Sequence, residues 1–174
     1  MKKMGKLIWI GVLFIVVGIL AGCATTAKVK ETKALPVEKT ENFVLSSVNI
    51  EVVDKTPKQD GQKFVQKIEE YLKLELSKNE IQVEKEAEKT LKVSIKRISI
   101  VNPARRFIPL VGVFGQSTIE ADVSLLDKDG SSLTSFQVSS MAGIRGALFE
   151  LDAIERITRK LAQEIVNRLK ALNN

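Results

Sequence analysis

The amino-acid sequence predicts an α+β fold, a two-layer sandwich in which two helices cover one face of a mainly antiparallel sheet of four to five strands. Residues 62–78 and 151–172 repeat apolar side chains every three or four positions, as in helices with one buried face. Residues 90–101 and 118–126 alternate apolar and polar side chains, as in half-buried strands. Residues 127–130 form a hairpin-type sequence. The predicted order is β-α-β-β-β-β-α.

The first elements belong to a single domain that we predict over residues 42–174. Residues 43–53 are rich in β-branched side chains and largely alternate, which predicts a strand that ends before Pro57. In the helix at 62–78, one face collects the apolar side chains Phe64, Val65, Ile68, Leu72 and Leu76. A short strand at 81–83 is expected next.

The strand predicted at residues 90–101 contains a change of phase. Its first apolar residues, up to Ile95, occupy odd positions, whereas Ile98 and Ile100 occupy even positions. Because strand side chains alternate between two faces, this shift would turn the later residues away from the core. A β-bulge near Arg97 would restore them to the same face.

The last elements are a hairpin and a long helix. The strand at 118–126 leads through Asp-Lys-Asp-Gly to a return strand at about 132–140. The helix at 151–172 has acidic residues at its start and basic residues near its end, a polarity that complements the helix dipole.

Residues 1–22 have the three parts of a secretory signal peptide. A basic start precedes an uncharged apolar run at 7–20, and small residues follow it. The sequence Leu-Ala-Gly-Cys at 20–23 resembles a lipobox, the cleavage motif of bacterial lipoproteins. The resemblance implies that Cys23 becomes the first mature residue and carries acyl chains that bind membrane lipid. Residue 24 is alanine rather than aspartate, which favours the periplasmic face of the outer membrane in a Gram-negative host.

Residues 23–41 are predicted to form the lipidated N-terminus and a flexible tether. They are polar, of mixed charge, and contain Pro36. Such a tether would span roughly 25 Å on average and up to about 60 Å when extended. It would hold the domain clear of the lipid headgroups.

Composition excludes several classes of function. The chain has no histidine and one cysteine, so it has no Ser-His-Asp or Cys-His catalytic arrangement, no histidine-ligated metal and no internal disulfide. The formal charge is +6, but removal of the signal peptide leaves 24 basic and 21 acidic residues. This near-neutral balance argues against a nucleic-acid partner. We expect neither a cofactor nor a metal.

Several motifs resemble a bacterial lipoprotein family of uncharacterised function, the DUF4410 type. They are Arg105-Arg106 before an apolar loop, the strand at 117–126, the turn at 126–130 and the small residues at 139–143. The family has no established activity to transfer. The predicted fold is also similar to periplasmic domains of lipoproteins that assemble envelope complexes, including the curli secretion channel, at the level of fold alone.

Residues 102–116 are unusually apolar for a connection between strands. One interpretation is a lid that folds back over the sheet. Another is an exposed loop that contacts a protein or a membrane, and a third is a phosphate-binding loop, which the short glycine spacing disfavours. The contact-loop candidates are Arg105, Arg106, Phe107, Leu110 and Phe114.

Residues 141–149 precede the last helix and contain two glycines around Arg145. This segment is either a plain connector or part of an anion site, in which Arg145 would join Arg105 and Arg106 at lipid phosphates.

Together these features predict a membrane-anchored envelope lipoprotein with a non-enzymatic accessory or assembly role through contacts with an unknown envelope protein. One alternative is a subunit of an oligomeric secretion or transport apparatus, which would make the chain a homo-oligomer. Another is a hydrolase that uses neither histidine nor cysteine. Asp122 lies on the polar side of its predicted strand, but the sequence offers it no partner acid.

Overall fold

The computed structural model describes residues 25–33, 44–58, 61–100, 117–142 and 150–172. Six strands and two helices lie within these ranges. They are β1 (Thr25–Lys33), β2 (Ser47–Asp54), α3 (Gln62–Lys78), β3 (Gln82–Val83), β4 (Thr90–Ser99), β5 (Ser117–Leu126), β6 (Ser132–Ala142) and α4 (Glu150–Leu172).

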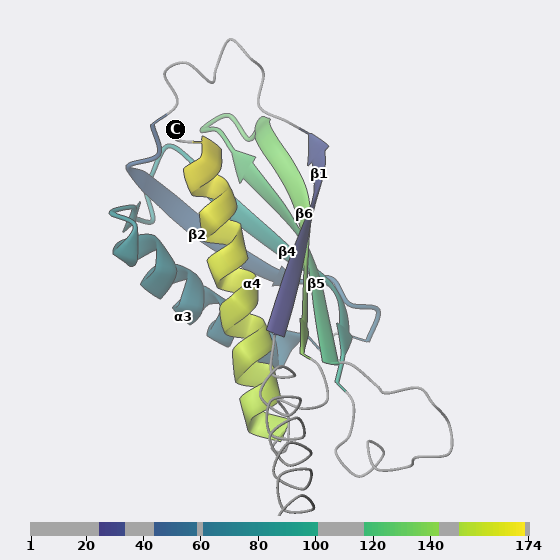
Figure 1. The fold of residues 1–174 in the computed structure, drawn as a ribbon. Helices are drawn as coiled ribbons and strands as arrows, with labels where there is room; N and C mark the ends of the chain where they lie inside the picture. Colours follow the sequence, from purple (N-terminus) through teal and green to yellow (C-terminus); the bar gives the residue numbers. More distant parts are fainter. Residues whose placement is uncertain (1–24, 34–43, 59–60, 101–116, 143–149, 173–174) are drawn as a thin grey trace, which may run out of the picture.

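The strands form one sheet in the order β1-β6-β5-β4-β2-β3, and both helices pack on one face of it (Figure 1). The pairs β1–β6, β6–β5 and β5–β4 are antiparallel, whereas β2 runs parallel to β4 and to β3. The two-layer α+β sandwich is therefore confirmed. The sheet has six strands rather than the four to five predicted.

The additional strand corrects part of the predicted tether. Thr25–Lys33 pairs antiparallel with β6, from Thr25 opposite Ala142 to Lys33 opposite Ser135. Along this strand Ala27 and Val29 are half-buried, while Lys28 is exposed. The prediction missed it because its inward side chains are small and its outward ones are charged, a pattern that a solvated linker also shows. The fold thus extends N-terminally to Thr25.

The helix and strand patterns that the sequence showed clearly are confirmed. Helix α3 occupies the predicted residues 62–78, and α4 begins one residue earlier than predicted. Between β4 and β5 the register shifts between Ile95 and Arg97, which is the predicted bulge. Ile98 consequently lies opposite Ile119, on the side that faces the helices.

The core lies between the helices and the sheet. Helix α3 contributes Phe64, Ile68, Leu72 and Leu76, and α4 contributes Ile157, Leu161, Ile165 and Leu169, all at most 1% exposed. The largest buried sheet residues are Leu91, Ile95, Ile119, Leu125 and Phe136.

The turn between β5 and β6 is the predicted hairpin. Asp127 N–H donates to Ser131 O at 2.9 Å, and Gly130 N–H donates to Asp127 O at 2.9 Å. Gly130 has φ of 80°, a left-handed conformation that glycine adopts without a steric cost. This turn fixes the register of β5 against β6.

Candidate functional site

All the site residues predicted from sequence lie outside the described residues. They are Cys23, Arg105, Arg106, Phe107, Leu110, Phe114 and Arg145. The structure nevertheless shows where the chain leaves the sheet toward each of them. Thr25 and Ser117 are both opposite Ala142. Thr25, Ser117 and Ala142 therefore lie in one row of the sheet. Thr25 is two positions after Cys23, Ser117 follows the segment 101–116, and Ala142 precedes the segment 143–149.

The next row of the sheet continues the same arrangement. Thr26 lies opposite Met141, which also lies opposite Thr118, and Thr118 lies opposite Ser99. Antiparallel pairing explains why β1 and β5 begin where β4 and β6 end. Helix α4 also begins shortly after β6 ends, at Glu150. We call this end of the sandwich, defined by Thr25, Ser99, Ser117 and Ala142, the anchor end.

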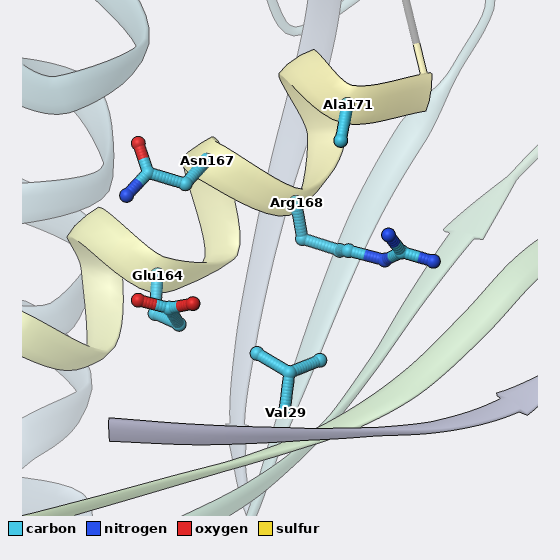
Figure 2. Close-up of a pocket in the computed structure, with 5 residues that line it drawn as sticks. All are labelled: Val29, Glu164, Asn167, Arg168 and Ala171. Atoms are coloured by element: carbon cyan, nitrogen blue, oxygen red, sulfur yellow. The ribbon is translucent and has the colours of Figure 1, made fainter. Parts of the chain in front are cut away.

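A groove of about 410 Å³ lies between β1 and α4 and is lined by Val29, Glu164, Asn167, Arg168 and Ala171 (Figure 2). Val29 points from the strand toward the helix, and the Arg168 side chain reaches over the sheet. The groove exists because β1 presents small side chains to α4 at this edge. Its apolar floor and mixed charges could hold an extended chain or a small amphipathic group. The sequence patterns gave no sign of it, since β1 itself was not predicted.

The face of the sheet opposite the helices carries ion pairs. Lys92 Nζ lies 2.7 Å from Glu51 Oε1, and Lys96 Nζ lies 3.2 Å from Asp122 Oδ2. Gln137 Nε2 also donates to Asp122 Oδ1 at 3.3 Å. Asp122, the residue considered for a hydrolase, is therefore engaged by a lysine and an amide. These exposed pairs contribute little to stability.

A second polar cluster joins β2 to α3. Thr56 donates to Asp54 Oδ1 from its backbone N–H at 2.8 Å and from its hydroxyl at 2.7 Å. Burial opposes ionisation of Asp54, but the hydrogen bonds from Thr56 and from the backbone N–H groups of Gly61 and Gln62 outweigh it, so the pKa of the carboxyl is lowered. Asp54 thus holds Thr56, whose hydroxyl accepts from the Gly61 N–H at 3.4 Å just before α3 begins.

A contact between the helices involves Tyr71. Burial and a hydrogen bond to the Glu155 carboxylate raise the pKa of the Tyr71 hydroxyl, and the Arg159 guanidinium lies 5.9 Å from the ring centroid. These groups hold α3 against α4 and have no reacting partner among the described residues.

Within the described residues no group of three or more histidine, cysteine, aspartate or glutamate side chains is placed to hold a metal ion. Neither of the two described helices is long and apolar enough to cross a membrane.

Solved structures with a similar fold include the PelC dodecamer from Paraburkholderia phytofirmans, with a TM-score of 0.51, 11% identity, and coverage of 83% of this chain and 97% of that chain. A DUF330-family protein from Xanthomonas campestris has a TM-score of 0.51 and 12% identity, covering 75% of this chain and 88% of that chain. At these identities the likeness shows the fold alone. No curated protein matches the chain.

A family match covers most of the sandwich. Residues 45–169 match LptE, a family described as lipopolysaccharide assembly. The match spans every described element except β1 and the last residues of α4. It agrees with the predicted class, an envelope assembly protein, although the family it names is not the DUF4410 type. The chain belongs to the LptE family of lipopolysaccharide assembly.

Proposed function

We propose that this protein is a non-enzymatic component of lipopolysaccharide assembly, anchored by acylated Cys23 to the periplasmic face of the outer membrane. The observation that carries the proposal is the family match over residues 45–169. The lipobox-like sequence at 20–23 supports the proposed attachment to the membrane. Lys96 and Gln137 engage Asp122, the residue considered for a hydrolase, which supports the non-enzymatic interpretation over that alternative.

Depletion in the native host tests the assembly role. We expect lipopolysaccharide at the surface of intact cells, measured by antibody labelling, to fall while the total amount per cell is maintained. A plasmid copy of the wild-type gene should restore the surface signal. Normal surface lipopolysaccharide after full depletion would contradict the proposal.

Mass spectrometry of the mature N-terminus tests the anchor separately. We expect a chain that begins at Cys23 with two or three acyl groups, because two chains give stable membrane attachment. A Cys23→Ser variant should leave the membrane fraction, since serine cannot form the thioether. An unmodified thiol at Cys23, or a chain that still begins at Met1, would contradict the lipid anchor.

The partner contact is assigned by this proposal to the predicted loop at residues 102–116, through Phe107, Leu110 and Phe114 with Arg105 and Arg106 at its base. Three apolar side chains at about 1.5–3 kcal/mol each could supply a useful affinity. Changing the three to serine should abolish co-purification of envelope partners while the melting temperature is maintained. A large fall in melting temperature would instead support the lid interpretation. Arg145 is assigned instead to an anion site with Arg105 and Arg106, at lipid phosphates.

A second candidate is a subunit of a homo-oligomeric assembly. The observation that favours it is the similarity of fold to a PelC dodecamer. Within the described sheet, β1 is an edge strand, but Lys28 and Lys30 along it disfavour edge-to-edge pairing, so a ring would use another surface. Light scattering of the detergent-extracted mature protein distinguishes a monomer from a ring.

A further inference from the structure

Because β1 is part of the sheet and begins at Thr25, a lipid anchor at Cys23 would hold the folded domain close to the membrane. Thr25 is two positions after Cys23, with Ala24 between them, and a fully extended chain advances at most about 3.6 Å per position. The Cα atom of Cys23 therefore lies within about 7 Å of the first residue of the sheet. A lipid on that cysteine would hold the anchor end directly at the bilayer rather than at the distance of a long tether.

The anchor end also has the charge that suits such a surface. The connection from β2 to α3 and the first turn of α3 carry Lys55, Lys58 and Lys63, all exposed, against Asp60 in sequence. The segments 101–116 and 143–149, whose flanking strand ends lie here, contain three arginines and no acid in sequence, and the first turn of α4 that follows adds Glu150 and Asp152, so bases still outnumber acids at this end. Headgroups of anionic lipids attract such basic groups over a distance of about 8–10 Å at ordinary salt.

The opposite end of the sandwich carries charges of both signs. The segments 79–89 and 127–131, which connect elements at that end, carry the acids Glu80, Glu84, Glu86, Glu88, Asp127 and Asp129. Against them stand the bases Lys85, Lys89 and Lys128. Lys78, Arg168 and Lys170, near the C-terminal ends of α3 and α4, also lie at this end, so its acids and bases balance.

A hollow at the anchor end combines positive charge with apolar side chains. It measures about 360 Å³ and is lined by Lys63, Phe64, Ile98, Ser99 and Ile100. The Lys63 ammonium lies 5.3 Å from the centroid of the Phe64 ring, and Ile98 and Ile100 are half-buried. Lys63 occupies the first turn of α3, where the helix dipole disfavours a cation, so helix stability does not account for it.

We propose that the anchor end rests on the bilayer that holds Cys23, with anionic phospholipid headgroups against Lys55, Lys58 and Lys63 and with Ile98 and Ile100 at the interface. This orientation rests on the proposed acylation of Cys23. It places α3 and α4 with their N-termini toward the lipid (Figure 1) and the opposite end of the sandwich away from it.

Fluorescent labels on the acylated full-length mature protein test the orientation. Lipid occupies the single native cysteine, so a cysteine introduced at an exposed position is the only reactive thiol. Ser99→Cys reports the anchor end and Glu86→Cys the opposite end. In vesicles that contain phosphatidylglycerol and lipid-attached quenchers, the label at position 99 should be quenched several-fold more than the label at position 86. Equal quenching, or stronger quenching at position 86, would overturn the proposal.

Matched lysine variants test the headgroup contact. Lys58→Gln with Lys63→Gln, in the Ser99→Cys background, should remove most of the extra quenching, whereas Lys85→Gln with Lys128→Gln should leave it unchanged. Neutral phosphatidylcholine vesicles should weaken the quenching in the same way as the first pair. Quenching that is insensitive to both the lysines and the lipid charge would overturn the contact. A protein that never enters the membrane fraction would instead refute acylation of Cys23, and with it the proposed anchor.

Discussion

Strands β5 and β1 have similar lengths, but β5 lies inside the sheet and β1 lies at its edge. β5 pairs with β4 on one side and β6 on the other, and every second side chain from Ser117 to Leu125 is buried. β1 pairs with β6 alone, and its inward residues Ala27 and Val29 are only half-buried. A regular alternation of large apolar residues therefore marks a strand that is covered. It does not mark every strand that is paired.

The difference has a physical reason. The free energy gained by β5 comes from apolar area removed from water, and that requirement leaves a clear pattern in sequence. β1 gains mainly backbone hydrogen bonds, which any side chain permits. Lysines at an exposed edge, here Lys28 and Lys30, also discourage pairing with other chains. The sequence of an edge strand can consequently resemble that of a linker.

The largest effect should come from charging the covered strand. Val123 is 0% exposed, so Val123→Asp would bury a carboxylate without a partner. The expected cost is several kcal/mol, enough to unfold a domain of ordinary stability. Circular dichroism and a melting curve would show it. A cooperative transition near that of the wild type would mean that β5 is not the centre of the core.

A smaller effect is expected where β2 meets α3, a junction held by polar contacts rather than by apolar burial. A Cβ atom at Gly61 would lie 2.5 Å from Asp54 Oδ1, so Gly61→Ala must displace the carboxylate that Thr56 holds. We expect a loss of about 1–3 kcal/mol in urea unfolding. In an Asp54→Ala background the same change should be nearly neutral, because residues in contact are not additive. Equal costs in both backgrounds would contradict the contact.

The same junction should make stability depend on pH. Because the folded-state pKa of Asp54 is lowered from 3.8, its contribution is present above that value and is lost as the pH falls through the lower folded-state pKa. Asp54→Asn should therefore cost about 1 kcal/mol at pH 6, the size of one typical hydrogen bond, and progressively less below about pH 4. A difference between variant and wild type that does not change with pH would show that the charge is not involved.

The smallest effect is expected at Val29 in β1, measured beside the matched change at Val123 in β5. Val→Thr keeps the shape and the β-branched side chain but adds a hydroxyl. At Val123 the hydroxyl would be buried, at a cost of about 1–3 kcal/mol, whereas at Val29, beside the groove, it remains hydrated and should cost less than about 0.5 kcal/mol. Denaturant midpoints measured side by side would give both values. Equal losses would mean that β1 is as buried as β5.

Most of the fold could be predicted because apolar burial leaves periodic signals. The change of parity after Ile95 was sufficient to place the bulge, and Gly130 was sufficient to place the hairpin. β1 could not be predicted, because its partner β6 lies more than a hundred residues away and its own residues are small or charged. Because of the extra strand, the domain is expected to lie directly beside Cys23 rather than at the end of a long tether.

The candidate site was less accessible to sequence reasoning. The apolar loop around Phe107 and the segment around Arg145 lie outside the described residues, so their roles remain predictions. The structure adds that the strand ends flanking both segments lie in one row with Thr25. The groove at Val29 depends on β1, and the hollow at Lys63 depends on long-range packing of α3 against the end of β4. No local pattern reports either arrangement.

The pairing of β1 is the claim on which the orientation at the membrane depends, and amide exchange measures it directly. In the mature protein, NMR should show that alternate amides between Thr25 and Lys33 exchange slowly, because every second N–H of an antiparallel edge strand faces its partner. The intervening amides face away from β6 and should exchange quickly. Exchange at random-coil rates throughout this segment would show that β1 does not pair with β6 and that these residues form a flexible tether instead.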